Sequence, residues 1–242
     1  EISLVYQPQL NKNKKIIGCE VLVRWQNETL GTVGPDKFIP IAEQTGLIVE
    51  LGNFILEESF KTFSSWTDKG IELEQFSINI SVRQLFHGSF VEEVERLTAK
   101  HLTSELTAKL IFEITETVLV EDIDKVVDVM KRLSHLNINF SMDDFGTGYS
   151  SLSYLKAMPV SELKIDQSFI ANLGKESSDQ AMIVTILNMA KIFNLKVVAE
   201  GVETEEQHSF LQKNNCHIYQ GYYFSKPLIY DDFESFYKSN IT

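Results

Sequence analysis

The chain has 242 residues, of which 43% are hydrophobic and 11% aromatic, and its formal net charge at pH 7 is −12. This length suffices for a large buried core, and one (β/α) barrel fits it as well as two small domains would. The negative charge argues against a protein that binds DNA or RNA polymers. The sequence has no run of about 18 apolar residues, so we expect no contact with a membrane. Two cysteines, Cys19 and Cys216, are too few for a disulfide framework and indicate buried thiols in a reducing compartment.

The chain opens with a predicted hairpin. Alternating residues indicate strands over 2–9 and 16–25, joined by a short polar turn. The turn folds Gln7 back near Glu20. The face of the second strand that carries Glu20 also carries Leu22 and Arg24.

Strands and helices then alternate along the whole chain. This alternation predicts a parallel sheet flanked by helices, and the number of units and the length are typical of a (β/α)8 barrel. The further predicted strands cover 76–81, 109–115, 138–142, 162–166, 195–199 and 217–224. The predicted helices cover 35–44, 49–66, 90–100, 121–135, 152–157, 179–193, 204–214 and 231–237.

The strand that ends near Met142 runs directly into two acidic residues, Asp143 and Asp144. Adjacent carboxylates repel each other, and one would stay protonated unless a cation lay between them. A hard divalent ion is the usual remedy, because carboxylate oxygens are its preferred ligands. The alternative is an ordinary turn with a helix N-cap, where Asp and the following Gly146 are common for local reasons.

Polar side chains recur at or near the other predicted strand ends as well. In a (β/α)8 barrel the active site lies where the parallel strands end, and burying so many polar groups without a purpose would be costly. An oxygen-rich set suits Mg²⁺ or Mn²⁺ rather than Zn²⁺, and an Asp shared by two ions would give a two-metal hydrolytic site. These residues are Glu20, Asn79, Glu113, Asp143, Asp144, Lys164, Glu200 and Gln220.

This pattern predicts metal-assisted hydrolysis of a phosphoester. A buried lysine beside the ions could position the attacking water. If Glu200 and Lys164 both point into the mouth of the barrel, burial by itself raises the pKa of Glu200 and lowers the pKa of Lys164.

Ordered motifs along nearly the whole chain resemble those of the EAL-domain cyclic di-GMP phosphodiesterases. Val21 stands where that family usually has Ala, and strand alternation points it away from Glu20 and into packing. The matching stretches are Tyr6-Gln7-Pro8, Glu20-Val21-Leu22-Val23-Arg24-Trp25, Phe38-Ile39-Pro40-Ile41-Ala42-Glu43, Asn79-Ile80-Ser81, Glu113-Ile114-Thr115-Glu116, Asp143-Asp144-Phe145-Gly146-Thr147-Gly148-Tyr149, Lys164-Ile165-Asp166, Ala199-Glu200-Gly201-Val202-Glu203 and Gln220-Gly221-Tyr222.

The resemblance implies a role for each matching residue. The first metal would be held by Glu20, Asn79, Glu113 and Asp143; Asp143 would bridge to a second ion, completed by Asp144 and by Glu200 as ligand or water-positioning base. The catalytic set would be Lys164, which contacts the attacking water, with Glu200, Glu203 and Gln220. The substrate would be held by Arg24 on a phosphate, Leu22 and Pro40 on a guanine, and Gln7 and Asp166 beside the ligand. Glu116 would anchor the loop 145–150 against a dimer face.

The resemblance also implies a TIM-like (β/α)8 barrel with one antiparallel strand, and hydrolysis of cyclic di-GMP to linear pGpG with two Mg²⁺ or Mn²⁺ ions. It implies a homodimer in the cytoplasm. Because the chain starts at Glu1 without a methionine, we interpret residues 1–242 as one domain excised from a longer signalling protein, with a sensory or GGDEF domain before it. The alternatives are a receptor that holds cyclic di-GMP without cutting it and, less favoured by Leu22 and Pro40, an unrelated phosphatase barrel.

Overall fold

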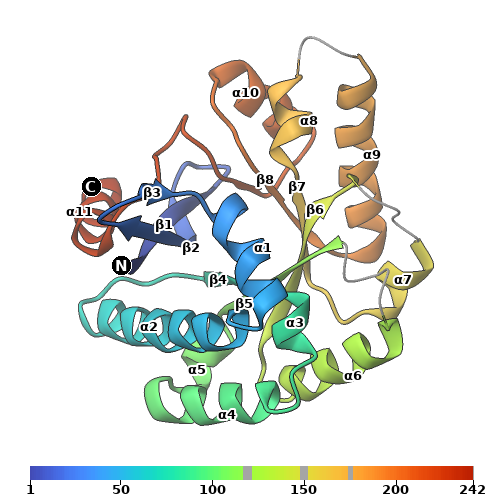
Figure 1. The fold of residues 1–242 in the computed structure, drawn as a ribbon. Coiled ribbons are helices and arrows are strands. Elements are labelled where there is room, and N and C mark those ends of the chain that lie inside the picture. Colours follow the sequence, from blue (N-terminus) through green and yellow to red (C-terminus); the bar gives the residue numbers. More distant parts are fainter. Residues whose placement is uncertain (117–121, 148–151, 174–176, 242) are drawn as a thin grey trace.

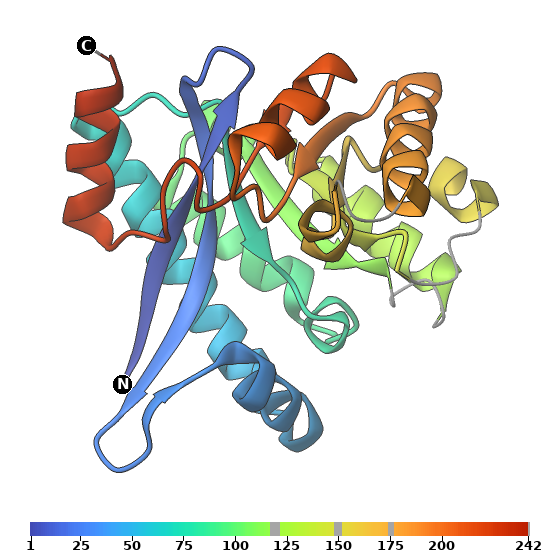
Figure 2. The ribbon, with the colours of Figure 1, turned by 90° about the horizontal axis from the view of Figure 1, so that it is seen from above.

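The structure is a computed structural model that describes residues 1–116, 122–147, 152–173 and 177–241. Its first two strands form the expected hairpin, with β1 over Ile2–Asn11 and β2 over Ile16–Asn27. The hairpin is the pair of long blue strands in Figure 2. Its register pairs Gln7 with Glu20, as the position of the turn predicts.

Further strands close a barrel with this hairpin (Figure 1). Their order is β1–β9–β8–β7–β6–β5–β4–β2, and the pairing of β1 with β2 closes the ring. β1 runs antiparallel to both neighbours, whereas the pairings from β2 round to β9 are parallel. The expected TIM-like barrel with one antiparallel strand is confirmed. The bounds are β4 Gln75–Asn79, β5 Leu110–Thr115, β6 Asn139–Phe145, β7 Glu162–Ile165, β8 Lys196–Ala199 and β9 Ile218–Tyr219.

The helices surround the strands on the outside (Figures 1 and 2). Their ends follow local chemistry: Pro35 occupies the first turn of α1, and Gly46 ends it with a left-handed φ of 81°. Thr204 and Gln207 form a capping box that starts α10. The predicted helices are α1 Pro35–Thr45, α2 Ile48–Asp68, α4 Phe90–His101, α6 Ile123–Ser134, α7 Leu152–Ala157, α9 Ser177–Phe193, α10 Glu205–Lys213 and α11 Tyr230–Ile241.

Several short elements differ from the sequence-based prediction. Two polar residues assigned to strand ends instead cap short helices: Ser81 accepts from the backbone N–H of Gln84, and Asp166 accepts from that of Ser168. Such helices are too short to show hydrophobic periodicity. The elements without a prediction are β3 Gly31–Val33, α3 Val82–Leu85, α5 Ser104–Thr107 and α8 Gln167–Ala171.

The last strand is much shorter than predicted. β9 ends at Tyr219, and Gln220 follows it rather than lying inside it. The aromatic residues that suggested a longer strand have another role, since Tyr223 and Phe224 pack against His208 of α10.

Aromatic side chains hold the helical layer against the barrel. Phe63 of α2 stacks on Phe76 of β4 with ring centroids 4.6 Å apart, and Trp66 stacks on Phe233 of α11 at 4.4 Å. These rings are buried, so they dominate the packing on this side of the barrel. Val21 is also buried in the core, as expected. Across the described parts of the chain, no helix combines the length and apolar character needed to cross a membrane.

Candidate active site

A buried lysine lies at the centre of the polar cluster at the carboxyl ends of the strands. Lys164 on β7 is 0% exposed. Its Nζ lies 2.5 Å from Glu113 Oε2 and 2.9 Å from Glu200 Oε1. Asp143 Oδ2 and Glu20 Oε2 follow at 3.3 and 3.5 Å. Four predicted site carboxylates from different strands or strand ends therefore converge on one ammonium group.

The Glu20 carboxylate is fixed on both oxygens. Asn79 Nδ2 donates to Glu20 Oε1 at 2.7 Å, and Gln220 Nε2 donates to Glu20 Oε2 at 2.5 Å. Because its nitrogen is engaged by Glu20, Asn79 offers its Oδ1 as the atom that could bind a cation. The structure thus brings Asn79 and Gln220 to the cluster, as predicted.

A bulge in β6 brings two adjacent aspartates to the same site. In a regular strand, neighbouring side chains point to opposite faces. Here the pairing of β6 with β7 shifts between Met142 and Phe145, and Asp144 has a φ of 54°. Bulges of this kind re-aim side chains next to active sites. As a result, oxygens of Asp143, Asp144 and Glu200 lie within 4.8 Å of one another.

The electrostatics of the cluster show an excess of negative charge. Burial and the neighbouring Asp143 carboxylate raise the pKa of Asp144 to about 6. Burial, opposed by Lys164 and reinforced by Asp143, raises the pKa of Glu200 to about 8. Burial and Glu20 also raise the pKa of Glu113 well above its ordinary range.

Lys164 departs from the expectation for a buried lysine. Burial lowers its pKa, but the carboxylates of Asp143, Glu113 and Glu20 outweigh burial and raise the pKa well above the ordinary value. Burial by itself acts in the expected direction, but the neighbouring carboxylates decide the net shift of the pKa of Lys164, and the sequence-based expectation did not include them. Glu20 shows the reverse balance: burial raises its pKa, and Lys164 with the hydrogen bond from Gln220 holds it below the ordinary value.

The donor set fits hard divalent cations. One ammonium compensates only part of the charge of the surrounding carboxylates, and Glu113 Oε1 is buried with no hydrogen-bond partner among the described residues. Carboxylate and amide oxygens are the ligands that Mg²⁺ and Mn²⁺ prefer. Glu20, Asn79, Glu113, Asp143, Asp144 and Glu200 could hold such ions.

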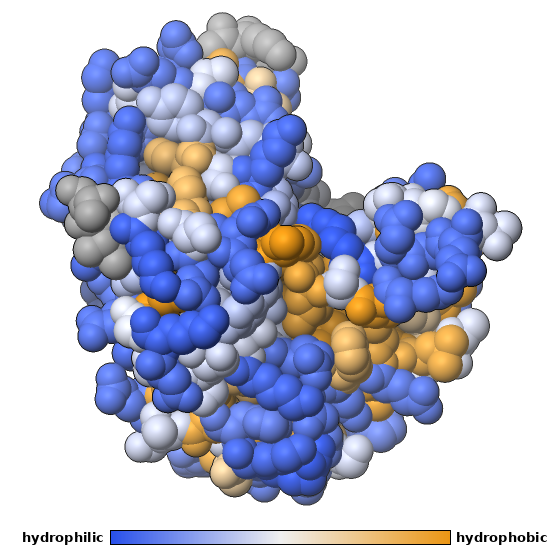
Figure 3. Space-filling model, turned by 90° about the vertical axis from the view of Figure 1, so that its left-hand side faces the viewer, coloured by the Kyte–Doolittle hydropathy of each residue, from blue (hydrophilic) through white to orange (hydrophobic). Residues whose placement is uncertain are grey.

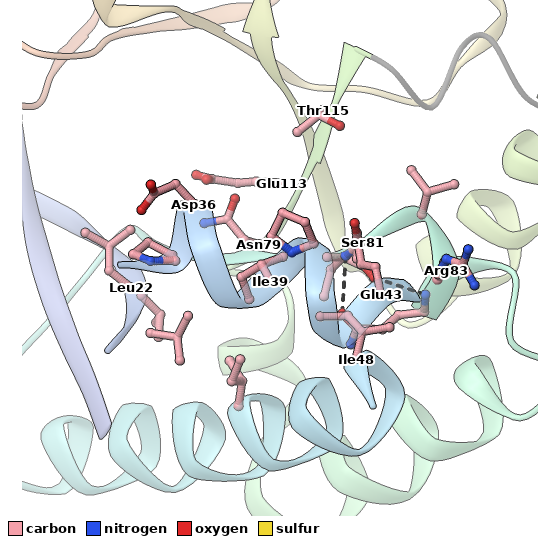
Figure 4. Close-up of a pocket in the computed structure, with 18 of the residues that line it drawn as sticks. Leu22, Asp36, Ile39, Glu43, Ile48, Asn79, Ser81, Arg83, Glu113 and Thr115 are labelled. Atoms are coloured by element: carbon pink, nitrogen blue, oxygen red, sulfur yellow. Dashed lines mark hydrogen bonds between the residues drawn. The ribbon is translucent and has the colours of Figure 1, made fainter. Parts of the chain in front are cut away.

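A cavity of about 650 Å³ opens beside this cluster. A space-filling view shows a hollow with hydrophobic walls between otherwise hydrophilic lobes (Figure 3). In the close-up, Glu113 and Asn79 lie between Leu22 on one side and Arg83 on the other, with Ile39 of α1 near Asn79 (Figure 4). Leu22, Arg24 and Pro40 line the cavity, as a substrate-binding role requires. The Arg24 guanidinium donates to the carbonyl of Val23 at 2.8 Å.

The remaining predicted site residues lie at different distances from the cluster. Gln7 is buried, and its Nε2 donates to the carbonyl of Ser225 at 2.5 Å. Asp166 lies close enough to Asp144 to raise the pKa of that carboxyl. Glu203 is exposed, and within the described residues its side chain makes no ion pair or hydrogen bond. The structure therefore does not bring Glu203 into the cluster.

Glu116 contacts the loop that it is predicted to anchor. Its Oε2 accepts from the backbone N–H of Gly146 at 3.1 Å, and Glu116 is 4% exposed. Gly146 has a φ of 96°, a conformation that favours glycine. Residues 148–150 of the predicted loop lie outside the described residues.

Sequence reasoning missed several residues around the site. Asp36, Glu43 and Arg83 line the cavity, but nothing in their spacing distinguishes them from surface charges. Gln9 is fully buried in the barrel beneath the cluster. It could have been found, because it lies two residues from Gln7 and therefore on the same face of β1.

Comparisons with known proteins agree with this geometry. Residues 1–227 match the family model of the EAL domain. The chain is 40% identical over 229 residues to the bifunctional diguanylate cyclase/cyclic di-GMP phosphodiesterase MucR of Pseudomonas aeruginosa, covering 94% of this chain and 33% of that protein. It is 36% identical over 241 residues to the cyclic di-GMP phosphodiesterase PdeR of Escherichia coli, covering 98% of this chain and 36% of that protein. The chain spans about a third of the length of these curated relatives.

Solved structures give the same result. The MucR phosphodiesterase in a c-di-GMP complex is 39% identical, with a TM-score of 0.91 over 96% of this chain and 94% of that one. The EAL enzyme Bd1971 in its cAMP- and cyclic-di-GMP-bound form is 35% identical, with a TM-score of 0.92 over 98% of this chain and 65% of that one. The family match and these relatives show that the chain belongs to the EAL domain family.

Proposed function

We propose that this domain hydrolyses cyclic di-GMP to linear pGpG with two Mg²⁺ or Mn²⁺ ions. The observation that carries the proposal is the convergence of four carboxylates on buried Lys164, beside a cavity of about 650 Å³. The cyclic di-GMP phosphodiesterases among the relatives, and the c-di-GMP complex of the MucR domain, support this substrate.

The cation sites would be provided by the acidic cluster, by which we mean the carboxylates of Glu20, Glu113, Asp143, Asp144 and Glu200. Glu20, Asn79, Glu113 and Asp143 would hold one ion. Asp143 would also bind the second ion, together with Asp144 and Glu200. Bound ions would lower the pKa of a water molecule and stabilise negative charge on the phosphate oxygens. The bulge at Asp144 supports this division, since it directs both aspartates to one site.

The cavity provides the substrate site. Arg24 would hold a phosphate, for which its planar fork of donors is suited, and Leu22 and Pro40 would pack against a guanine. Gln7 and Asp166 would lie beside the ligand. Because Glu203 is exposed, any contribution from it would come through the bound substrate rather than through the acidic cluster.

Hydrolysis requires one water and one phosphodiester. The water oxygen forms a bond to phosphorus, the bond from phosphorus to the 3′ oxygen breaks, and the 3′ oxygen leaves with a proton. Lys164 would contact the attacking water and Glu200 would orient it, while Gln220 holds Glu20 in place. These roles act mainly in the transition state, so their loss would reduce kcat more than binding.

The domain is proposed to act within a larger cytoplasmic protein. The curated relatives are about three times as long as the chain, which supports further domains, such as a sensory or GGDEF domain. A homodimer interface at the loop 145–150 would be coupled to Asp143 and Asp144 through the contact between Glu116 and Gly146.

An assay of turnover tests the proposal. The purified domain is incubated with cyclic di-GMP with and without Mg²⁺, and pGpG is separated by chromatography. We expect pGpG only when Mg²⁺ is present. A protein that binds cyclic di-GMP with Mg²⁺ or Mn²⁺ but yields no pGpG over hours, even as a dimer, would be a receptor and not an enzyme.

A further inference from the structure

A chain of buried amides runs through the barrel beneath the acidic cluster. Gln9 and Glu162 are 0% exposed and Gln75 is 1% exposed. Gln75 Nε2 donates to Gln9 Oε1 at 2.9 Å, and Gln9 Nε2 donates to Gln220 Oε1 at 3.0 Å. Gln220 Nε2 then donates to Glu20 Oε2. We call Gln75, Gln9 and Gln220 the glutamine chain.

Every hydrogen bond of the glutamine chain points in the same direction. Gln9 and Gln220 each accept through the side-chain oxygen from the preceding residue and donate through the nitrogen to the next. Gln75 only donates, and its Oε1 has no hydrogen-bond partner among the described residues. An amide whose oxygen is held in this way must present its N–H groups on the other side. Gln220 therefore directs a donor at Glu20, where a flipped amide would direct its carbonyl oxygen at a carboxylate.

Glu162, the first residue of β7, contacts the first amide of the glutamine chain. Gln75 Nε2 donates its second hydrogen to Glu162 Oε2 at 3.2 Å. This oxygen accepts whether the carboxyl group is ionised or neutral, so it keeps the nitrogen of Gln75 directed at Gln9 and Glu162 in either state. Burial raises the pKa of Glu162.

A glycine on β2 makes room for the amides. Gly18 pairs with Gln9 of β1 on one side and with Gln75 of β4 on the other. A Cβ atom at Gly18 would lie 2.5 Å from Gln75 Cγ and 3.1 Å from Gln9 Oε1. The sequence thus leaves space in the barrel for two glutamine side chains that an alanine would displace.

We propose that the glutamine chain fixes the orientation of the Glu20 carboxylate for cation binding, and that Gln9, Gln75 and Glu162 are positioning residues for this site. The inference rests on the proposed function, because Glu20 is one of the proposed ligands. The amides are buried and mutually bonded, so one of them cannot turn without leaving its neighbours unpaired. Replacing a residue that hydrogen-bonds to a metal ligand commonly changes the affinity for the metal by about 10- to 100-fold.

The first test measures Mn²⁺ alone by calorimetry. Gln9→Met preserves length and burial but removes both hydrogen bonds. We expect it to raise the dissociation constant for Mn²⁺ by about tenfold or more. Ser77→Ala is the matched control, since Ser77 is fully buried and its hydroxyl has no hydrogen-bond partner among the described residues. A folded Gln9→Met protein with the Mn²⁺ affinity of Ser77→Ala would overturn the proposal.

A pair of variants at Glu162 separates positioning from packing. Glu162→Gln keeps an acceptor oxygen for Gln75, and Glu162→Leu does not. We expect Glu162→Gln to bind Mn²⁺ as the wild type does, and Glu162→Leu to bind more weakly. Equal affinities of the two variants would contradict the proposal.

The wild-type protein offers a measurement that no folding defect can obscure. When Mg²⁺ is added, we expect the side-chain amide resonances of Gln220, Gln9 and Gln75 to shift. Gln207, whose side chain donates to the carbonyl of Ile170, is the control and stays unchanged. A shift of Gln220 without any shift of Gln9 and Gln75 would overturn the glutamine chain alone. No shift at all, together with no Mn²⁺ binding, would overturn the proposed function as well.

Discussion

Lys164 carries the only ammonium group that the described residues place within the acidic cluster, and it is completely buried. It therefore stabilises a set of carboxylates whose mutual repulsion it cannot cancel completely. In the proposed function, the lysine holds the carboxylates together and divalent ions would supply the missing positive charge.

Replacement of Lys164 tests this dependence. We expect Lys164→Met to lower the free energy of unfolding by roughly 3–5 kcal/mol without divalent ions, because it leaves buried carboxylates without their partner. Mg²⁺ should restore part of the loss. Urea denaturation with EDTA and then with Mg²⁺ measures both. Lys196→Met, at an exposed position on β8, is the control. A loss no larger than that of the control would contradict the expectation.

Replacement of Arg24 tests the proposed binding of the substrate. We expect Arg24→Ala to weaken the binding of cyclic di-GMP by about 1.5–3 kcal/mol, because it removes a charge-assisted hydrogen bond to a phosphate. Calorimetry with Ca²⁺ in place of Mg²⁺ measures binding without turnover. Arg96→Ala is the control, since Arg96 pairs with Glu93 on the surface of α4. Unchanged affinity in Arg24→Ala would place Arg24 outside the binding site.

Individual side chains were predictable where their strand is regular. Glu20, Leu22 and Arg24 share a face of β2, and alternation is sufficient to group them. Asp144 was identified as a candidate, but its direction depends on the bulge in β6, and alternation alone would point it away from Asp143. The pKa of Lys164 could not be predicted, because it depends on charges that only the closed barrel brings together.

Helix α10 packs a histidine against aromatic rings. His208 is 4% exposed, and its ring lies 4.7 Å from that of Tyr219. Burial lowers the pKa of His208, the Lys14 ammonium lowers it further, and Glu205 opposes this change. His208 therefore binds a proton less readily in the folded domain than in the unfolded chain.

A pH titration of stability checks this state. The pKa of His208 is lower in the folded than in the unfolded chain, where it is about 6.5. As the pH falls below about 6.5, the unfolded chain binds more protons, so the free energy of unfolding decreases. His208→Gln removes this proton uptake. We expect its free energy of unfolding to fall less steeply than that of the wild type between about pH 7.5 and 5.5. Parallel curves would show that His208 does not titrate differently in the two states.

Long elements were predictable and short ones were not. α2 and α6 bury a regular apolar face, and their periodicity gives their position within a few residues. β9 was predicted too long, because aromatic residues favour strands by composition while Tyr223 and Phe224 pack against α10. The cap residues Ser81 and Asp166 have the polar character of site residues, and only the structure separates these two roles.

The whole barrel combines an acidic surface with a polar interior. The net charge of −12 repels an anionic ligand, so the proposed binding of a substrate with phosphate groups would depend on local cations such as Arg24 and on metal ions. The antiparallel β1 contributes Gln7 and Gln9 to the interior, and the parallel strands contribute the acidic cluster. Hydrogen bonds in the barrel interior thereby connect the acidic cluster to the buried glutamines. The side chains that make these bonds come from several different strands or strand ends.

The rate of pGpG formation by Asp143→Asn tests most directly whether this cluster is the centre of hydrolysis. The substitution preserves size but removes the charge of the proposed bridging ligand, which a two-metal site tolerates poorly. Circular dichroism would verify the fold, and calorimetry would verify the binding of cyclic di-GMP. With both preserved, we expect no detectable Mg²⁺-dependent pGpG from Asp143→Asn under conditions in which the wild type converts its substrate. Retention of most of the wild-type rate would contradict the account.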